Sequence, residues 1–246
     1  MNAKEKKKEQ KPKSEDSDAG TADLIRELGL GIPGTDFESD LQYISIIGSI
    51  EGHIALPMEN KTTKYEHLIP QLIAVEENPK LRGLLVILNT MGGDVEAGLA
   101  LAEMIATLSK PTVSLVLGGG HSIGIPLATA TDYSFIAGTA TMTLHPIRTT
   151  GLVITAETTF DYMRKTQDRV IDFIAGHSRA TRKRVTELMN CSDNMSNDVG
   201  TILFGKEAVD AGIIDAVGGV SQALGELRRR VAKVDELEKE ISISTD

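Results

Sequence analysis

Short apolar runs alternate with glycine-rich turns and amphipathic stretches through the middle of the chain. The run at 40–50 is rich in β-branched residues, and the runs at 83–90 and 111–120 are almost continuously apolar. Continuous apolar runs of this length are typical of strands that are buried on both faces of a parallel sheet. The pattern therefore predicts strands over these three ranges, followed by two short strands at 133–138 and 139–146.

Between these strands the apolar spacing is helical. The stretch 63–81 repeats apolar residues such as Leu68 and Leu72 at helical intervals, and Pro70 is expected to bend this helix or to mark a late start. A glycine turn followed by a helix is predicted over 91–109, and a similar turn and helix follow the next strand. This alternation predicts an α/β domain with a largely parallel sheet, in which functional sites lie at the turns after the strands.

Helices dominate the second half of the chain. Further helices are expected at 180–190, at the start of 205–219 and in the charged stretch after 220. A long amphipathic helix is predicted over 154–178. Because the α/β core is complete without it, we expect an exposed apolar stripe that holds a homo-oligomer together. The apolar positions of this helix include Phe160, Met163, Val170, Phe173 and Ile174.

The N-terminal segment differs in composition from the rest of the chain. Residues 1–22 are rich in Lys and Glu and contain few apolar groups, so a disordered charged tail is predicted. This tail is interpreted as solubilising, with docking to a partner or to an acidic membrane surface as the alternative. The remainder, 23–246, is predicted to form one domain with a sizeable core.

Composition narrows the classes of function. Lys and Arg number 26 against 35 Asp and Glu, giving a net charge of −9, which argues against nucleic acid as a partner. The single cysteine, Cys191, lies in a polar stretch, excludes a disulfide within the chain and suits a reducing compartment. No apolar run approaches the roughly 20 residues of a transmembrane segment, and no secretory signal is evident. A cytoplasmic location is expected.

The stretch "GGGHSIGIPLATA" at 118–130 carries the candidate chemistry. Ser122 is either a nucleophile beside free backbone N–H groups or simply the N-cap of the helix that follows. Acyl transfer also needs an oxyanion site, which glycine turns and helix N-termini supply from the backbone. The turns "TMGGD" and "GGGHSIG" could aim the N–H groups of Gly93 and Ile123 at one point beside Ser122.

His145 is the candidate general base. It lies at the end of a predicted short strand, and Pro146 stiffens the exit of the chain. The alternative is a core histidine whose hydrogen bonds are satisfied by the backbone. His121, next to the serine, is expected to point elsewhere. No zinc-type Cys/His spacing occurs, so neither a metal nor an organic cofactor is expected.

"GHSIG" also matches the G-x-S-x-G nucleophile elbow of α/β-hydrolases. In that fold an acid and then the histidine follow the serine at longer range. A histidine only 23 residues after the serine therefore fits that fold poorly.

Four segments occur in a fixed order: "ILNTMGGDVEAGLALAEMI", "GGGHSIGIPLATA", "MTLHP" and "GKEAVDAGIIDAV". Over about 40–220 they resemble the Clp protease proteolytic subunit (ClpP) family, and most of all its translocation-enhancing branch. The resemblance implies an α/β, ClpP/crotonase-like core of stacked βαβ units with a projecting handle helix, here 154–178, which joins ring to ring. It also implies a Ser/His/Asp peptidase site inside a barrel of stacked rings.

By position, the resemblance makes Ser122 the nucleophile, His145 the base, and the N–H groups of Gly93 and Ile123 the oxyanion hole. The acid is displaced: anchoring on "EAV" at 207–209 puts Gly200 at its position. Asp198, two residues earlier, is the predicted third member, with Asp193 further off.

Two other departures from the family concern its assembly. The stretch between His145 and the "EAV" motif is longer than in the family, so the handle is expected to be remodelled. The N-terminal segment lacks the family's axial-loop pattern, which argues against partnership with a ring-shaped ATP-driven unfoldase.

The predicted function is a cytoplasmic serine endopeptidase that cleaves short or unfolded polypeptides through an acyl-enzyme. It would act as a ring-shaped homo-oligomer, with a link to protein export or quality control. A catalytically weak or inactive scaffold is the alternative that Gly200 favours. A crotonase-type acyl-CoA site would need an adenine-phosphate site, and none is evident. A Ser/Lys signal-peptide peptidase would normally carry a membrane anchor, and none is expected here because no apolar run is long enough.

Overall fold

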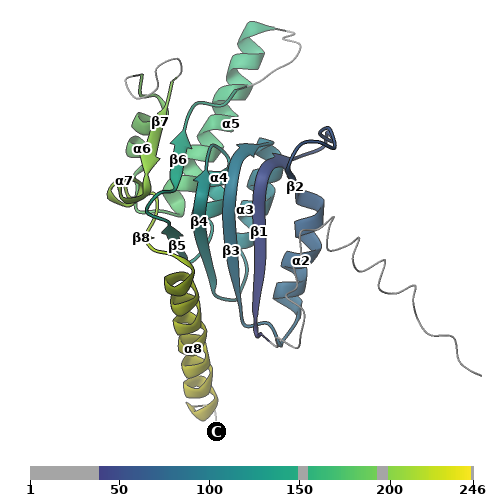
Figure 1. The fold of residues 1–246 in the computed structure, drawn as a ribbon, viewed down its shortest axis with the longest axis vertical. Helices are drawn as coiled ribbons and strands as arrows, with labels where there is room; N and C mark the ends of the chain where they lie inside the picture. Colours follow the sequence, from purple (N-terminus) through teal and green to yellow (C-terminus); the bar gives the residue numbers. More distant parts are fainter. Residues whose placement is uncertain (1–38, 149–154, 193–198, 245–246) are drawn as a thin grey trace, which may run out of the picture. The chain divides into compact units, whose positions relative to one another are not determined.

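The computed structural model describes residues 39–148, 155–192 and 199–244, with side chains as far as Ile241. Its centre is a sheet in the order β2-β1-β3-β4-β5-β8, in which every neighbouring pair is parallel (Figure 1). β6 pairs with the end of β4, and β7 runs antiparallel to β6. The predicted α/β class is therefore confirmed. The strands are β1 (Leu41–Glu51), β2 (Thr62–Lys64), β3 (Gly83–Gly93), β4 (Thr112–Gly120), β5 (Tyr133–Ile136), β6 (Thr141–Leu144), β7 (Thr201–Phe204) and β8 (Ala216–Val217).

Helices follow the strands much as the spacing predicts. Pro70 lies inside the first of them, which begins only at Tyr65. The helix predicted after the glycine turn within 91–109 is confirmed and begins at Val95, although the turn itself is the end of β3, which extends to Gly93. The three-residue strand β2 was not predicted. The helices are α2 (Tyr65–Glu77), α3 (Val95–Ala106), α4 (Gly124–Thr129), α5 (Ala156–Gly176), α6 (Arg182–Met189), α7 (Gly205–Asp210) and α8 (Val220–Ser244).

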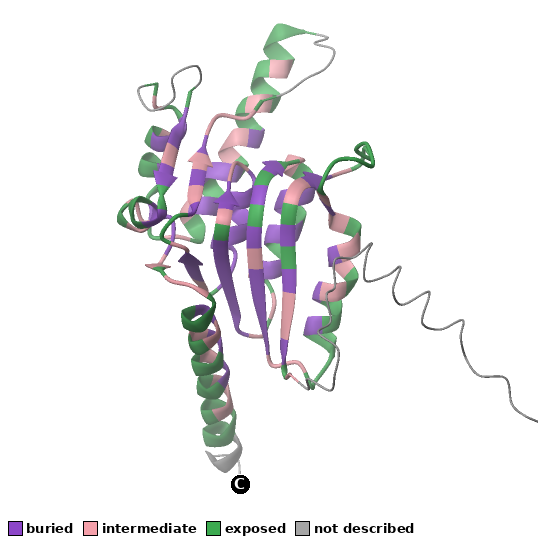
Figure 2. Ribbon diagram, viewed as in Figure 1, coloured by how far each residue is buried: buried purple, intermediate pink, exposed green. Residues whose placement is uncertain are grey.

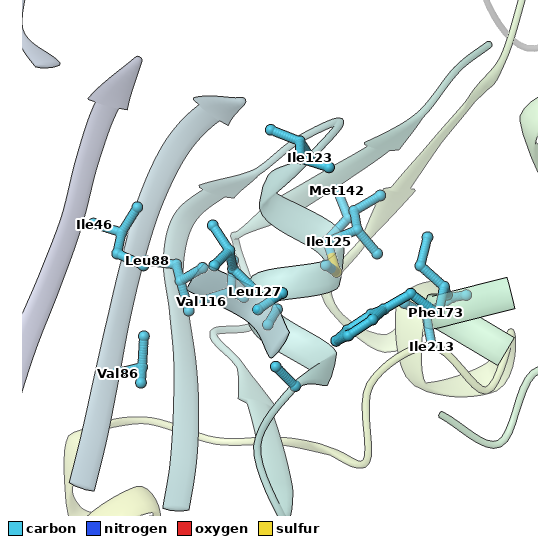
Figure 3. Packing of buried hydrophobic residues seen from close by; sticks show 14 of the residues in the cluster. Ile46, Val86, Leu88, Val116, Ile123, Ile125, Leu127, Met142, Phe173 and Ile213 are labelled. Atoms are coloured by element: carbon cyan, nitrogen blue, oxygen red, sulfur yellow. The ribbon is translucent and has the colours of Figure 1, made fainter. Parts of the chain in front are cut away.

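The central strands are apolar on both faces because helices cover both faces of the sheet. On β3, Val86 and Leu88 pack into the large core cluster together with residues such as Leu127 of α4 (Figure 3). The same cluster also contains residues of α2 and α3. Leu85, the residue before Val86, packs on the opposite face of the sheet with Leu227 and Val231 of α8. This two-sided burial explains why the strand appears in the sequence as a continuous apolar run (Figure 2).

The helix α5 is divided into an exposed half and a buried half. Its first half, up to Lys165, is almost entirely exposed (Figure 2). In the second half, Val170 and Ile174 are buried in the core. The expectation that this helix stands outside a complete core is therefore wrong for its second half, where the apolar stripe packs within the chain. Phe160, at 68% exposure, remains uncovered.

The tail at 1–22 lies outside the described residues, so its predicted disorder and the boundary at residue 23 stay predictions. Within the described ranges, no helix combines the length and the apolar character needed to cross a membrane.

Candidate active site

The turn at the end of β3 supplies the first half of the site. Gly92 and Gly93 have φ values of +90° and +155°. A Cβ on Gly93 would lie 2.2 Å from the Ile50 carbonyl oxygen, so the neighbouring strand leaves room only for glycine. Ile50 pairs with Gly93 and accepts the Asp94 N–H at 2.9 Å. In a parallel ladder this pattern turns the Gly93 N–H away from β1.

The turn at the end of β4 supplies the second half. Ser122, with φ +54°, is the only non-glycine residue at positive φ in the part of the chain that the structure describes. That conformation costs about 1–3 kcal/mol and persists only where the surroundings enforce it. Here the Ser122 N–H donates to the Thr143 carbonyl at 2.9 Å, and this bond anchors the turn on the neighbouring strand β6.

Ser122 does not cap the helix that follows it. The N-cap of α4 is Ile123, and no side chain caps this helix. The N-cap alternative for Ser122 is therefore wrong. The Ile123 N–H donates to no acceptor among the described residues, so it remains available at the start of the helix.

The two turns are in direct contact. A Cβ on Gly92 would lie 2.8 Å from the Ser122 Cβ and 3.4 Å from the Ile123 nitrogen. The absence of a side chain at Gly92 is thus what allows the serine turn to approach the β3 turn.

His145 follows β6, and its ring is held by the main chain. Its Nδ1 lies 2.7 Å from the Pro146 carbonyl oxygen. A carbonyl can only accept, so Nδ1 carries the proton and donates it, which leaves Nε2 unprotonated in the neutral ring. This is the tautomer that a general base requires.

His121 is occupied elsewhere, as expected from its place beside the serine. Its Nδ1 is hydrogen-bonded to the Thr143 hydroxyl at 2.9 Å. Its Nε2 lies over Gly119, 2.6 Å from the position that a Cβ on Gly119 would take. Burial lowers the pKa of His121, and the nearby His145 lowers it further. His121 therefore favours the neutral form close to the candidate base.

The predicted nucleophile, base and oxyanion donors line one cavity of about 120 Å³. Four of the five predicted site residues are thereby brought together: Gly93, Ser122, Ile123 and His145. The rest of the wall is apolar except for one arginine, and consists of Val95, Ile125, Leu144, Ile147, Arg148, Val170, Ile174 and Met189. The second half of α5 thus forms part of the site.

The fifth predicted residue, Asp198, lies outside the described residues, as does Asp193. Gly200, which stands where the family has its acid, is described and packs against the base. A Cβ at this position would lie 2.2 Å from the Leu144 carbonyl oxygen and 3.0 Å from the His145 Cβ. With this backbone no acidic side chain fits at position 200, and the Pro146 carbonyl is the described partner of Nδ1.

Sequence reasoning missed the acceptor carbonyls of Thr143 and Pro146 because any residue type can provide a main-chain carbonyl. It also missed the apolar wall from α5. Among the described residues, no group of three or more His, Cys, Asp or Glu side chains is placed to hold a metal ion.

This arrangement of two glycine turns, a serine and a histidine at one cavity is consistent with the Clp protease family. The family's sequence model matches residues 39–221, and the chain belongs to that family. It is 53% identical over 223 residues to the translocation-enhancing protein TepA of Halalkalibacterium halodurans, a match covering 90% of this chain and 87% of that protein. It is 25% identical over 209 residues to the ATP-dependent Clp protease proteolytic subunit of Streptococcus uberis, covering 79% of this chain and 94% of that protein.

Proposed function

We propose that the chain is a serine endopeptidase that hydrolyses peptide bonds of short or unfolded polypeptides. The observation that carries this proposal is the conformation and position of Ser122. It is held at φ +54° and does not cap the helix that follows it. It lines the same cavity as His145. A strained serine whose side chain makes no hydrogen bond to the described residues, in one cavity with a histidine of the right tautomer, is what nucleophilic catalysis needs.

In the proposed reaction, Ser122 Oγ attacks the carbonyl carbon of the scissile bond while His145 Nε2 accepts its proton. The N–H groups of Gly93 and Ile123 donate to the oxyanion of the tetrahedral intermediate. His145 then protonates the leaving amine, and the C–N bond breaks to give the acyl-enzyme. Water, deprotonated by the same Nε2, hydrolyses the ester and restores Ser122.

The cavity also supports a class of substrate. Its walls, including Val95, Val170 and Ile174, are apolar, and its volume of about 120 Å³ is on the scale of one aliphatic side chain. We propose that the residue before the scissile bond is apolar and of medium size.

Asp198 remains our proposed third member of the site. Its carboxylate would stabilise the imidazolium that forms when His145 accepts the proton, which the neutral Pro146 carbonyl does less well. Gly200, two residues on, has φ +142° and lets the chain pass close to His145. Among the described residues, the Pro146 carbonyl holds the tautomer.

We further propose a ring-shaped homo-oligomer in the cytoplasm, joined partly through α5. The exposed Phe160 and Tyr162 on its first half support this assembly. The name of the 53% identical relative supports a link to protein translocation. No ATP-driven unfoldase is proposed as a partner.

A second candidate function is a catalytically weak or inactive scaffold of the same fold. Glycine in place of the family's acid at position 200 favours it. Labelling Ser122 with a fluorophosphonate in the assembled protein separates the two functions, since a scaffold would leave the serine unreactive.

A further inference from the structure

The side chains of Glu96 and Arg169 join two walls of the catalytic cavity from outside. The Arg169 Nη1 lies 2.7 Å from Glu96 Oε1, and Nη2 lies 3.0 Å from Oε2. Two parallel bonds of this kind fix the relative orientation of both groups as well as their separation. In accordance with this pairing, hydrogen bonding to Arg169 lowers the pKa of Glu96.

Each partner is the immediate neighbour of a residue in the cavity wall. Glu96 follows Val95 in the first turn of α3, three residues after the oxyanion donor Gly93. Arg169 precedes Val170, which belongs to the wall that α5 contributes. The ion pair therefore connects the segment that carries the oxyanion turn to the helix that faces it.

Beside this ion pair, α3 and α5 contribute buried apolar residues to the same core cluster, among them Leu99 and Phe173. A second cavity of about 410 Å³ also lies between the two helices, lined by Glu96, Leu99, Ala100 and Glu103 from α3 and by Arg169, Asp172 and Phe173 from α5. Across the described residues of these helices, Glu96–Arg169 is the only ion pair that spans the gap.

We infer that Glu96 and Arg169 act as a latch that positions the oxyanion turn relative to α5. They are positioning residues, because neither lines the catalytic cavity. Both side chains are about half exposed, at 46% and 52%. Such pairs add little to global stability, so the effect of the latch is local. The catalytic consequence rests on the proposed function, whereas the positional claim does not.

Hydrogen–deuterium exchange of the full-length assembled protein tests the latch without reference to activity. In Arg169→Gln we expect the amides of 92–98 to exchange about tenfold faster or more, because the turn opens locally more often. Arg169→Lys keeps the charge but loses the second bond, and should give a smaller increase. Glu96→Gln combined with Arg169→Gln should be no worse than either single change.

Arg182→Gln is the matched control. Arg182 is equally exposed and binds Asp168 and Asp172, so its ion pairs tie α6 to α5 and not to α3. Its loss should leave exchange at 92–98 unchanged. Unchanged exchange at 92–98 in Arg169→Gln, or an equal increase in Arg182→Gln, would overturn the latch.

Peptide hydrolysis measured on the same samples adds the catalytic consequence. We expect kcat to fall about tenfold in Arg169→Gln with little change in KM, since the oxyanion donors act mainly in the transition state. A wild-type protein without any hydrolysis would contradict the proposed function, while the exchange comparison would still decide the latch.

Discussion

Gly200 lies directly against the main chain of His145. A Cβ at position 200 would come within 3.1 Å of the His145 Cα and within 2.2 Å of the preceding carbonyl oxygen. The position that the resemblance assigns to the family's acid thus packs against the candidate base. This arrangement makes the glycine itself a requirement of the site.

Gly200→Ala is therefore expected to displace the end of β6. At φ +142°, with a backbone atom in the way, the alanine should destabilise the fold by about 1–3 kcal/mol and lower peptidase activity. Thermal unfolding and peptide hydrolysis measure the two effects. Gly176→Ala is the control, because a Cβ there meets no atom within 4 Å. Similar stability and activity in both variants would contradict the packing argument.

The role of Asp198 is tested by comparing Asp198→Asn with Asp193→Asn. Because the Pro146 carbonyl already holds the His145 tautomer, the loss should be smaller than the roughly 10⁴-fold seen when an acid is the sole partner. We expect kcat to fall about tenfold or more in Asp198→Asn and to stay near wild type in Asp193→Asn. Equal, near-wild-type rates in a peptidase assay would mean that the carbonyl suffices.

His121 should make stability depend on pH. Its pKa in the folded protein is below the ordinary 6.5, because of burial and the nearby His145. Its contribution is therefore fully present above pH 6.5 and is lost as the pH falls through 6.5 toward the folded pKa, since the unfolded chain binds the proton first. The Tm of the wild type should fall more than that of His121→Gln between about pH 7.5 and about pH 5.5. Parallel decreases in Tm would contradict this prediction.

Assembly through α5 predicts that its exposed aromatic residues hold protomers together. Phe160 and Tyr162 are 68% and 62% exposed, so Phe160→Ser with Tyr162→Ser should lower the mass measured by light scattering. Met58→Ser, which changes a fully exposed apolar residue elsewhere, should leave the mass unchanged. A monomeric wild type would contradict both the role of α5 as a handle and the assembly into rings.

Much of the fold is evident in the sequence because burial on both faces gives continuous apolar runs, as in β3 and β4. β2 was missed because three residues are too few to show a period. The amphipathic pattern of α5 identified its apolar positions but not what they pack against, so the burial of Val170 in the core of its own chain was unexpected.

The site was predictable to the extent that backbone geometry demands particular residues. Gly93 and Ser122 lie in turns with positive φ, a conformation that glycine adopts freely and that strains other residues. Glycines therefore mark these turns in the sequence. The carbonyl that holds His145 and the ion pair between Glu96 and Arg169, which are 73 residues apart, leave no local signal in the sequence. Both depend on how separate segments meet in space.

Mass spectrometry after fluorophosphonate treatment of the wild type and Ser122→Ala tests the central claim most directly. The account predicts one covalent adduct per chain, on Ser122, and loss of both the adduct and about 10⁴-fold or more of the peptidase rate in a variant with unchanged unfolding. An unlabelled, folded wild type, or a Ser122→Ala variant that is still labelled and active, would contradict it.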